Sequence, residues 1–128
     1  MKAILNKLKK ALHELEKKHG PIFVFILFLR EQSAGGWDLV VAAPWLSTND
    51  MNSYKIVASK VQKLLNTKEI VQMSRVVIID VDDPVVAFLQ GLYNVPNGQF
   101  KEIENCEPFS RRFNFKIEQA YLLRCIKG

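Results

Sequence analysis

Three aspartates that follow an apolar segment are the residues of this chain best placed to perform chemistry. Asp80, Asp82 and Asp83 come after Val-Val-Ile-Ile at 76–79 and just before Pro84. If the strand predicted for 76–81 continues, the carboxylates of Asp80 and Asp82 point the same way and can share one Mg²⁺ ion, which prefers oxygen ligands. Open α/β sheets place ligands beyond the carboxyl ends of such strands. One interpretation is therefore a magnesium site that activates water or steadies a phosphoryl group.

The same aspartates have a structural interpretation that involves no ligand, and we favour it. Asp82 or Asp83 is a suitable cap for a helix that begins at Pro84. Asp80 then simply marks the exposed end of the strand. On this interpretation the aspartates include no metal ligand and no catalytic residue, and the chain needs no cofactor.

The segment Val-Val-Ile-Ile-Asp-Val-Asp at 76–82 resembles the acidic motif of two phosphate-handling families. Haloacid dehalogenase-like hydrolases require a larger parallel sheet after this motif, and only about 45 residues follow it here. The topoisomerase-primase domain pairs its Asp-x-Asp strand with a glutamate after an earlier strand, and Glu31 is similar in placement. That family continues from the glutamate into a helix, whereas this chain turns into the segment 37–43. The resemblance implies an alternative function, a magnesium-dependent phosphodiesterase or phosphotransfer enzyme with Glu31, Asp80 and Asp82 as catalytic residues.

Other sequence patterns that carry chemistry are missing from the chain. There is no Gly-x-x-x-x-Gly-Lys-Ser/Thr loop and no Gly-x-Gly-x-x-Gly, so ATP and NAD are not implied. His13 and His19 have no acid or nucleophile spaced to suggest a triad. Cys106 and Cys125 are too few for a zinc cluster, and we expect them to be buried free thiols, with a single disulfide as the alternative.

The basic charge of the chain is concentrated at its N-terminus. Residues 1–20 contain six lysines and two glutamates, a net charge of +4, whereas the whole chain carries +5. Met1 and four leucines recur every three or four residues, which predicts an amphipathic helix over 1–19 with one apolar stripe: Leu5, Leu8, Leu12 and Leu15. The stripe either packs on its own domain, which we favour, or binds a protein partner, including a second copy of the chain in a homodimer. Membrane-surface binding is less favoured because the helix has no aromatic anchors.

Two tryptophans bracket a segment of small and apolar residues. Trp37 and Trp45 stand at the two ends of 37–45. Tryptophans at strand ends commonly pack the rim of a core, but they also bind protein partners and stack on nucleobases. Arg111 and Arg112 can add phosphate contacts, although adjacent residues on a strand point to opposite sides. Nucleic acid is therefore the weaker of the partner hypotheses.

The remaining patterns predict a mixed sheet. The segment 22–29 is β-branched and aromatic throughout, which is typical of a central strand, and 37–43 forms a hairpin with it across a loop at 31–36. A helix over 51–65 leads to a strand at 76–81, so the strands at 37–43 and 76–81 are parallel. A third helix begins at Pro84, and short strands are expected near 100–103, 113–117 and 120–126, the last of which also fits a helix.

We therefore expect an α+β or α/β fold in a single domain over 1–128, with helix 1–19 attached to a sheet body at 20–128. The sheet has about five strands, partly antiparallel, and three helices cover it in a two-layer or three-layer sandwich. The longest apolar run, 22–29, is too short to cross a membrane, and no secretory signal is recognisable, so we expect a cytoplasmic protein. The expected function is that of a small accessory or regulatory module that binds another macromolecule.

Overall fold

The computed structural model describes residues 1–30, 36–96, 100–114 and 116–127. Ten elements follow one another along the chain: α1 (Lys2–His19), β1 (Val24–Arg30), β2 (Trp37–Ala42), α2 (Met51–Leu64), α3 (Thr67–Ile70), β3 (Met73–Ile78), α4 (Pro84–Leu92), β4 (Lys101–Ile103), α5 (Glu107–Phe113) and β5 (Ile117–Cys125).

The five strands form one open mixed sheet in the order β3-β2-β1-β5-β4. β1 occupies the centre and pairs antiparallel with β2 and with β5. β3 pairs parallel with β2, and α2 and α3 form the connection between them, as the strand–helix–strand pattern predicted. The hairpin loop predicted between β1 and β2 falls largely on 31–35, outside the described residues.

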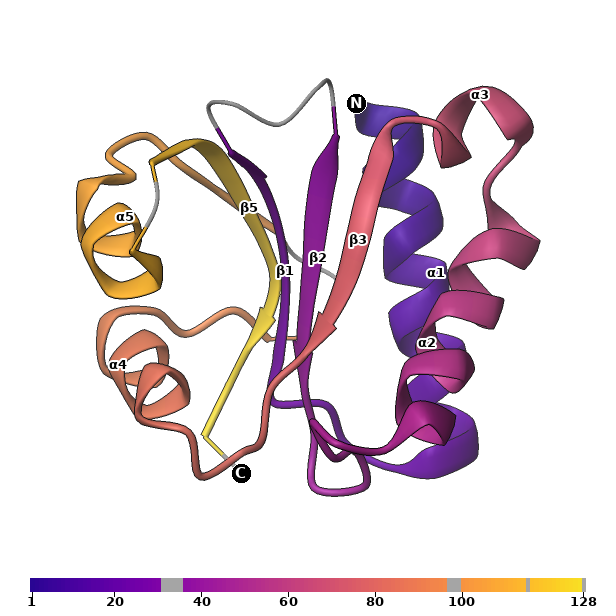
Figure 1. The fold of residues 1–128 in the computed structure, drawn as a ribbon, viewed down its shortest axis with the longest axis horizontal. Coiled ribbons are helices and arrows are strands. Elements are labelled where there is room, and N and C mark those ends of the chain that lie inside the picture. The colour runs from indigo at the N-terminus through magenta and orange to yellow at the C-terminus, as the bar shows by residue number, and fades with distance from the viewer. Residues whose placement is uncertain (31–35, 97–99, 115, 128) are drawn as a thin grey trace.

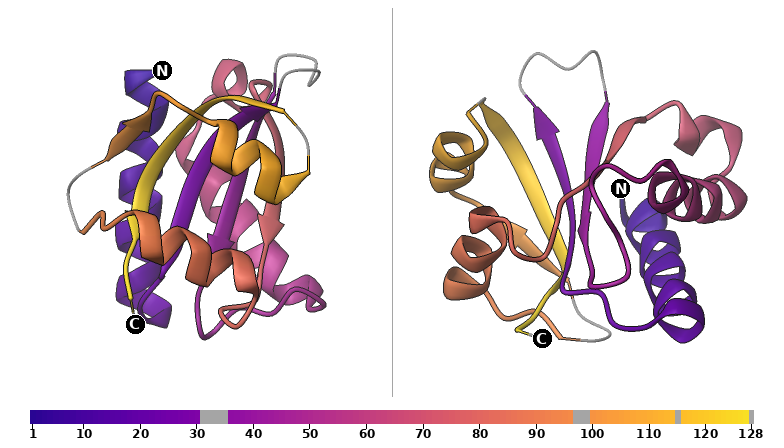
Figure 2. Two further views of the ribbon diagram at one scale, coloured as in Figure 1. Left: turned by 90° about the vertical axis from the view of Figure 1, so that its left-hand side faces the viewer. Right: turned by 60° about the horizontal axis from the view of Figure 1, so that its bottom comes forward.

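Helices cover both faces of the sheet and make three layers. α1, α2 and α3 lie on one face, and α4 and α5 lie on the other (Figure 1; Figure 2 shows the layers from two further sides). The mixed α+β fold with five strands is confirmed. The structure has five helices among the described residues, not the predicted three, because α3 and α5 are short and lack a long periodic pattern.

Alternate residues of the central strand β1 supply the two halves of the core. Phe25 and Leu27 pack with the leucines of α1. Ile26 and Phe28 pack with α4 and α5 on the opposite face. All four side chains are at most 1% exposed, which explains why the segment carries no polar residue.

The last third of the chain corrects one prediction. A strand was expected over 113–117, but α5 extends through Phe113 and β5 begins only at Ile117. Pro108 lies in the first turn of α5, where its fixed φ suits a helix, and Asn114 ends the helix in the left-handed conformation at φ 62°. The strands expected near 100–103 and 120–126 are present as β4 and β5.

No helix in the described ranges combines the length and the hydropathy needed to cross a membrane.

Candidate functional site

The aspartates considered as a metal site fasten the backbone at one edge of the sheet. Asp80 Oδ1 accepts a hydrogen bond of 3.0 Å from the backbone N–H of Thr48, which ties the loop after β2 to the end of β3. Asp83 Oδ1 accepts from the backbone N–H of Val85 at 2.9 Å and caps α4. Asp82 is exposed. Asp83 therefore has the capping role that the structural interpretation assigned to Asp82 or Asp83.

The magnesium alternative includes Glu31, which the structure does not describe, so its three carboxylates stay a prediction. Arg30, which precedes Glu31, ends β1. Asp80 follows β3, which runs antiparallel to β1, so β1 and β3 finish at opposite ends of the sheet (Figure 1). Nowhere in 1–30, 36–96, 100–114 or 116–127 do three or more His, Cys, Asp or Glu side chains gather as a metal site.

The leucine stripe of α1 is packed inside the protein. Leu5, Leu8, Leu12 and Leu15 are 1–4% exposed and join the core on the α1 side of the sheet. This is the packing that we favoured from the sequence. Nearly all of the surface of these four side chains is covered by contacts within the chain, and their assignment to a partner-binding surface stays a prediction.

The two tryptophans lie at opposite ends of β2 and do not form one surface. Trp37 is 8% exposed, and its ring centroid is 5.6 Å from that of Tyr121. Trp45 donates its indole N–H to the carbonyls of Gly20 and Pro21 at 3.1 and 3.0 Å. Trp37 thus packs against a ring of β5, and the two hydrogen bonds of Trp45 fasten the turn that follows α1.

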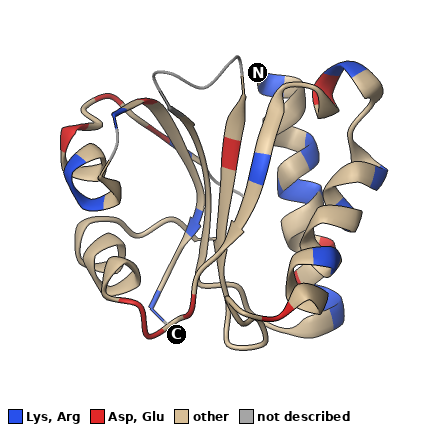
Figure 3. Ribbon diagram, in the orientation of Figure 1, with Lys and Arg blue, Asp and Glu red and all other residues tan. Residues whose placement is uncertain are grey.

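The positive charge of the chain is concentrated in the helical layer formed by α1, α2 and α3. α1, α2 and α3 carry ten lysines and three glutamates, a net charge of +7. Because the whole chain carries +5, the rest of it has a net charge of −2. Basic residues accordingly gather on α1, α2 and α3 in Figure 3, and the lower edge on the other side is acidic.

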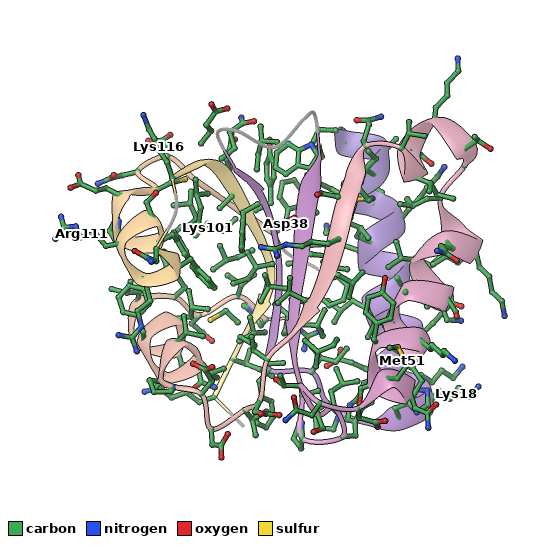
Figure 4. All side chains as sticks on the ribbon, viewed as in Figure 1. Lys18, Asp38, Met51, Lys101, Arg111 and Lys116 are labelled. Atoms are coloured by element: carbon green, nitrogen blue, oxygen red, sulfur yellow. The ribbon has the colours of Figure 1, made fainter. Side chains whose placement is uncertain are left out.

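A groove of about 530 Å³ lies between α1 and α2 and contains four of these lysines. We call it the lysine groove. Six of its lining residues lie on one face of α2, at positions 52, 55, 56, 59, 60 and 63, and four come from the last turns of α1, at 14, 15, 18 and 19. Lys18 and the start of α2 at Met51 lie at the same end of the molecule (Figure 4).

One carboxylate faces the lysine groove, and it is already paired. Glu14 Oε1 accepts a hydrogen bond of 3.1 Å from Lys60 Nζ, which lowers the pKa of the Glu14 carboxyl. Lys18, Lys55 and Lys63 are exposed and make no ion pair with any of the described residues. The groove therefore presents three uncompensated ammonium groups.

A buried carboxylate that the sequence analysis did not single out lies on the other face of the sheet. Asp38 is 0% exposed in the middle layer of the fold, and its Oδ2 atom is 3.3 Å from Arg75 Nε on the neighbouring strand (Figures 3 and 4). Register pairs Asp38 with Arg75 across β2 and β3. The sequence did contain a sign of this pair, because Asp38 lies inside the apolar segment 37–43. A carboxylate buried among apolar residues requires a partner of opposite charge or a hydrogen-bond donor.

Arg75 borders a cavity of about 290 Å³ between the sheet and the layer formed by α4 and α5. We call it the arginine pocket. Its apolar walls come from Phe28, Val40, Val77, Ile79, Val85 and Phe113, and its charged lining consists of Arg75, Arg112 and Asp83. Arg112 was considered before only as one of two adjacent arginines on a strand, whereas it lies in α5.

Both cysteines are buried free thiols, as expected. Burial raises the pKa of the Cys106 thiol and raises that of Cys125 to about 11. Thiolates rather than thiols attack electrophiles, so neither residue is a nucleophile near neutral pH.

The raised pKa of Cys125 predicts a loss of stability at alkaline pH. Above about pH 9 the thiol of the unfolded chain ionises, while the buried thiol of the folded chain keeps its proton. The contribution of Cys125 to the free energy of unfolding is therefore complete below about pH 9 and is lost as the pH rises through about 11. Urea unfolding of the wild type and of Cys125→Ala at about pH 8 and about pH 11 measures the effect. The wild type is expected to lose about 2 kcal/mol more than the variant. An equal loss in both proteins would contradict the assignment.

Comparison of the chain with protein-family models, with curated proteins and with solved structures gave no match.

Proposed function

We propose that the chain is a binding module that docks an acidic segment of another protein in the lysine groove. The observation that carries the proposal is the concentration of Lys18, Lys55 and Lys63, uncompensated among the described residues, along one groove between two helices. A groove of one sign of charge attracts ligands of the opposite sign and raises their association rate. On this proposal the chain is an accessory or regulatory module whose partner binds away from the buried leucine stripe.

The composition of the groove favours an acidic protein segment over a nucleic acid. None of its lining residues is an arginine, phenylalanine, tyrosine or tryptophan. Arginine binds phosphate groups through two parallel hydrogen bonds, and the aromatic side chains stack on nucleobases. The ring of His19 already stacks on Trp45 with centroids 4.7 Å apart. Leu15 and Ile56 give the groove an apolar component, which suits a segment that alternates carboxylates with aliphatic side chains.

A charge-reversal variant tests this proposal. The probe is a fluorescein-labelled amphipathic peptide of glutamate and leucine, and its binding to the full chain is followed by fluorescence anisotropy. Changing Lys18, Lys55 and Lys63 together to glutamate is expected to weaken binding at least about tenfold at low salt, because attraction becomes repulsion. Raising the salt from about 50 mM to about 300 mM is expected to weaken wild-type binding and to have less effect on the variant.

Two controls separate the groove from the overall charge. The variant Lys101→Glu, Arg111→Glu, Lys127→Glu makes the same change in net charge on exposed residues outside the groove, and it is expected to bind the peptide nearly as the wild type does. A peptide with glutamine in place of glutamate is expected not to bind. Equal weakening by both variants, or tighter binding of a short DNA duplex than of the acidic peptide, would overturn the proposal.

A further inference from the structure

The arginine pocket has the construction of a small-ligand site and is separate from the lysine groove. It lies on the opposite face of the sheet and has no lining residue in common with the groove. Six of its nine lining residues are apolar, and the others are charged. Pockets for small molecules are generally of this kind, with apolar walls and a few polar groups that fix the orientation of the ligand.

One guanidinium of the pocket is held in place from within the protein. Asp38, which is fully buried, forms an ion pair with Arg75 at Nε, the nitrogen next to the aliphatic stem. A guanidinium has five N–H donors, so one carboxylate does not exhaust its capacity. The Arg75 side chain is 48% exposed, which leaves it accessible from the pocket. Asp38 therefore positions Arg75 without closing the pocket.

The second guanidinium belongs to α5. Arg112 lies over the ring of Phe88, 5.6 Å from its centroid, and is otherwise exposed. The only carboxylate among the lining residues is that of Asp83, which already accepts the hydrogen bond that caps α4. Arg75 is thus compensated by Asp38 but keeps N–H donors, whereas Arg112 makes no ion pair with any of the described residues. Guanidinium donors from two sides of the pocket favour a ligand with a pair of acceptor oxygens, such as a carboxylate.

We propose that the arginine pocket binds a small monocarboxylate that carries an apolar ring or chain. Arginine is suited to this task because its planar fork matches the two oxygens of a carboxylate. The apolar part of the ligand then lies against Val77, Ile79 and Phe113. A cavity of about 290 Å³ is at the small end of ligand sites, so the ligand has on the order of ten non-hydrogen atoms.

Titration with two probes of the same shape tests the proposal. Phenylbutyrate and phenylbutanol share an apolar body, but only the first is an anion. Heteronuclear NMR on the full chain is expected to show saturable shifts of Val77, Val85 and Phe113 with phenylbutyrate, and binding of phenylbutanol at least about tenfold weaker. Arg112→Gln is expected to weaken phenylbutyrate binding about tenfold, because Arg112 is exposed and its loss removes a ligand contact and not a core contact.

Arg111→Gln is the matched control, since Arg111 is the neighbour of Arg112 in the same helix and does not line the pocket. Its binding of phenylbutyrate is expected to equal that of the wild type. Arg75→Gln, checked first for a native spectrum, is expected to weaken binding as Arg112→Gln does. Equal affinity for the acid and the alcohol, shifts confined to residues of α1 and α2, or no saturation up to about 10 mM would overturn the proposal.

Discussion

Replacing Arg124 by methionine is expected to lower the free energy of unfolding by about 3–5 kcal/mol. The Arg124 side chain on β5 is 6% exposed and donates a hydrogen bond of 2.7 Å from Nη2 to Glu16 Oε1 near the end of α1. Without Arg124, the Glu16 carboxylate, which is 17% exposed, would lose its cation in a site of restricted solvation. Urea denaturation of the wild type and the variant measures the loss.

The double variant Glu16→Gln, Arg124→Met separates the pair from the packing around it. Glutamine retains an oxygen that can accept the hydrogen bond that Glu16 now receives from the backbone N–H of Ile22 at 2.9 Å. Removing both charges together is expected to recover most of the loss, since a buried ion pair contributes little beyond an apolar replacement. A single-variant cost below about 1 kcal/mol, or a double variant whose loss equals the sum of the two single losses, would contradict this account.

The pair could not have been predicted from the sequence because its members are 108 positions apart. Arg124 stands in an apolar segment that fitted a strand or a helix, and nothing local indicated a partner on α1. The same applies to Asp38 and Arg75, whose pairing depends on the register between β2 and β3. Local patterns give the type of an element, whereas ion pairs between elements depend on how those elements are placed.

The parts of the fold that were predicted correctly have strong local signals. The unbroken apolar segment of β1 identified the central strand, and the helix at 51–64 between two strands implied their parallel pairing. α3 was missed because it has four residues, even though Asn66 and Glu69 form a capping box at its start. At α5, the alternation of Phe113, Phe115 and Ile117 outweighed the helix signal of Pro108.

The candidate sites were predictable only in part. The concentration of lysines in the N-terminal helix was visible in the sequence, but the groove also needs Lys55, Lys60 and Lys63 from a second helix packed beside it. Asp80 and Asp83 drew attention as potential ligands because their types suit a metal, whereas their observed hydrogen bonds go to backbone N–H groups. Residue types reveal what chemistry a chain can perform, and the tertiary structure decides which groups remain available for it.

Leu8→Ala is expected to destabilise the protein by about 2–5 kcal/mol without changing its oligomeric state. Leu8 is 1% exposed and lies in the core between α1 and the sheet, so its truncation leaves a cavity that the surrounding side chains fill incompletely. Lys10→Ala, an exposed position on the same helix, is the control and is expected to change stability by less than about 0.5 kcal/mol. Urea denaturation gives the stability, and light scattering gives the mass of each variant.

If the stripe bound a second copy of the chain, Leu8→Ala would convert a dimer into a stable monomer. Loss of stability at constant mass is instead the outcome expected of a leucine that packs on its own sheet.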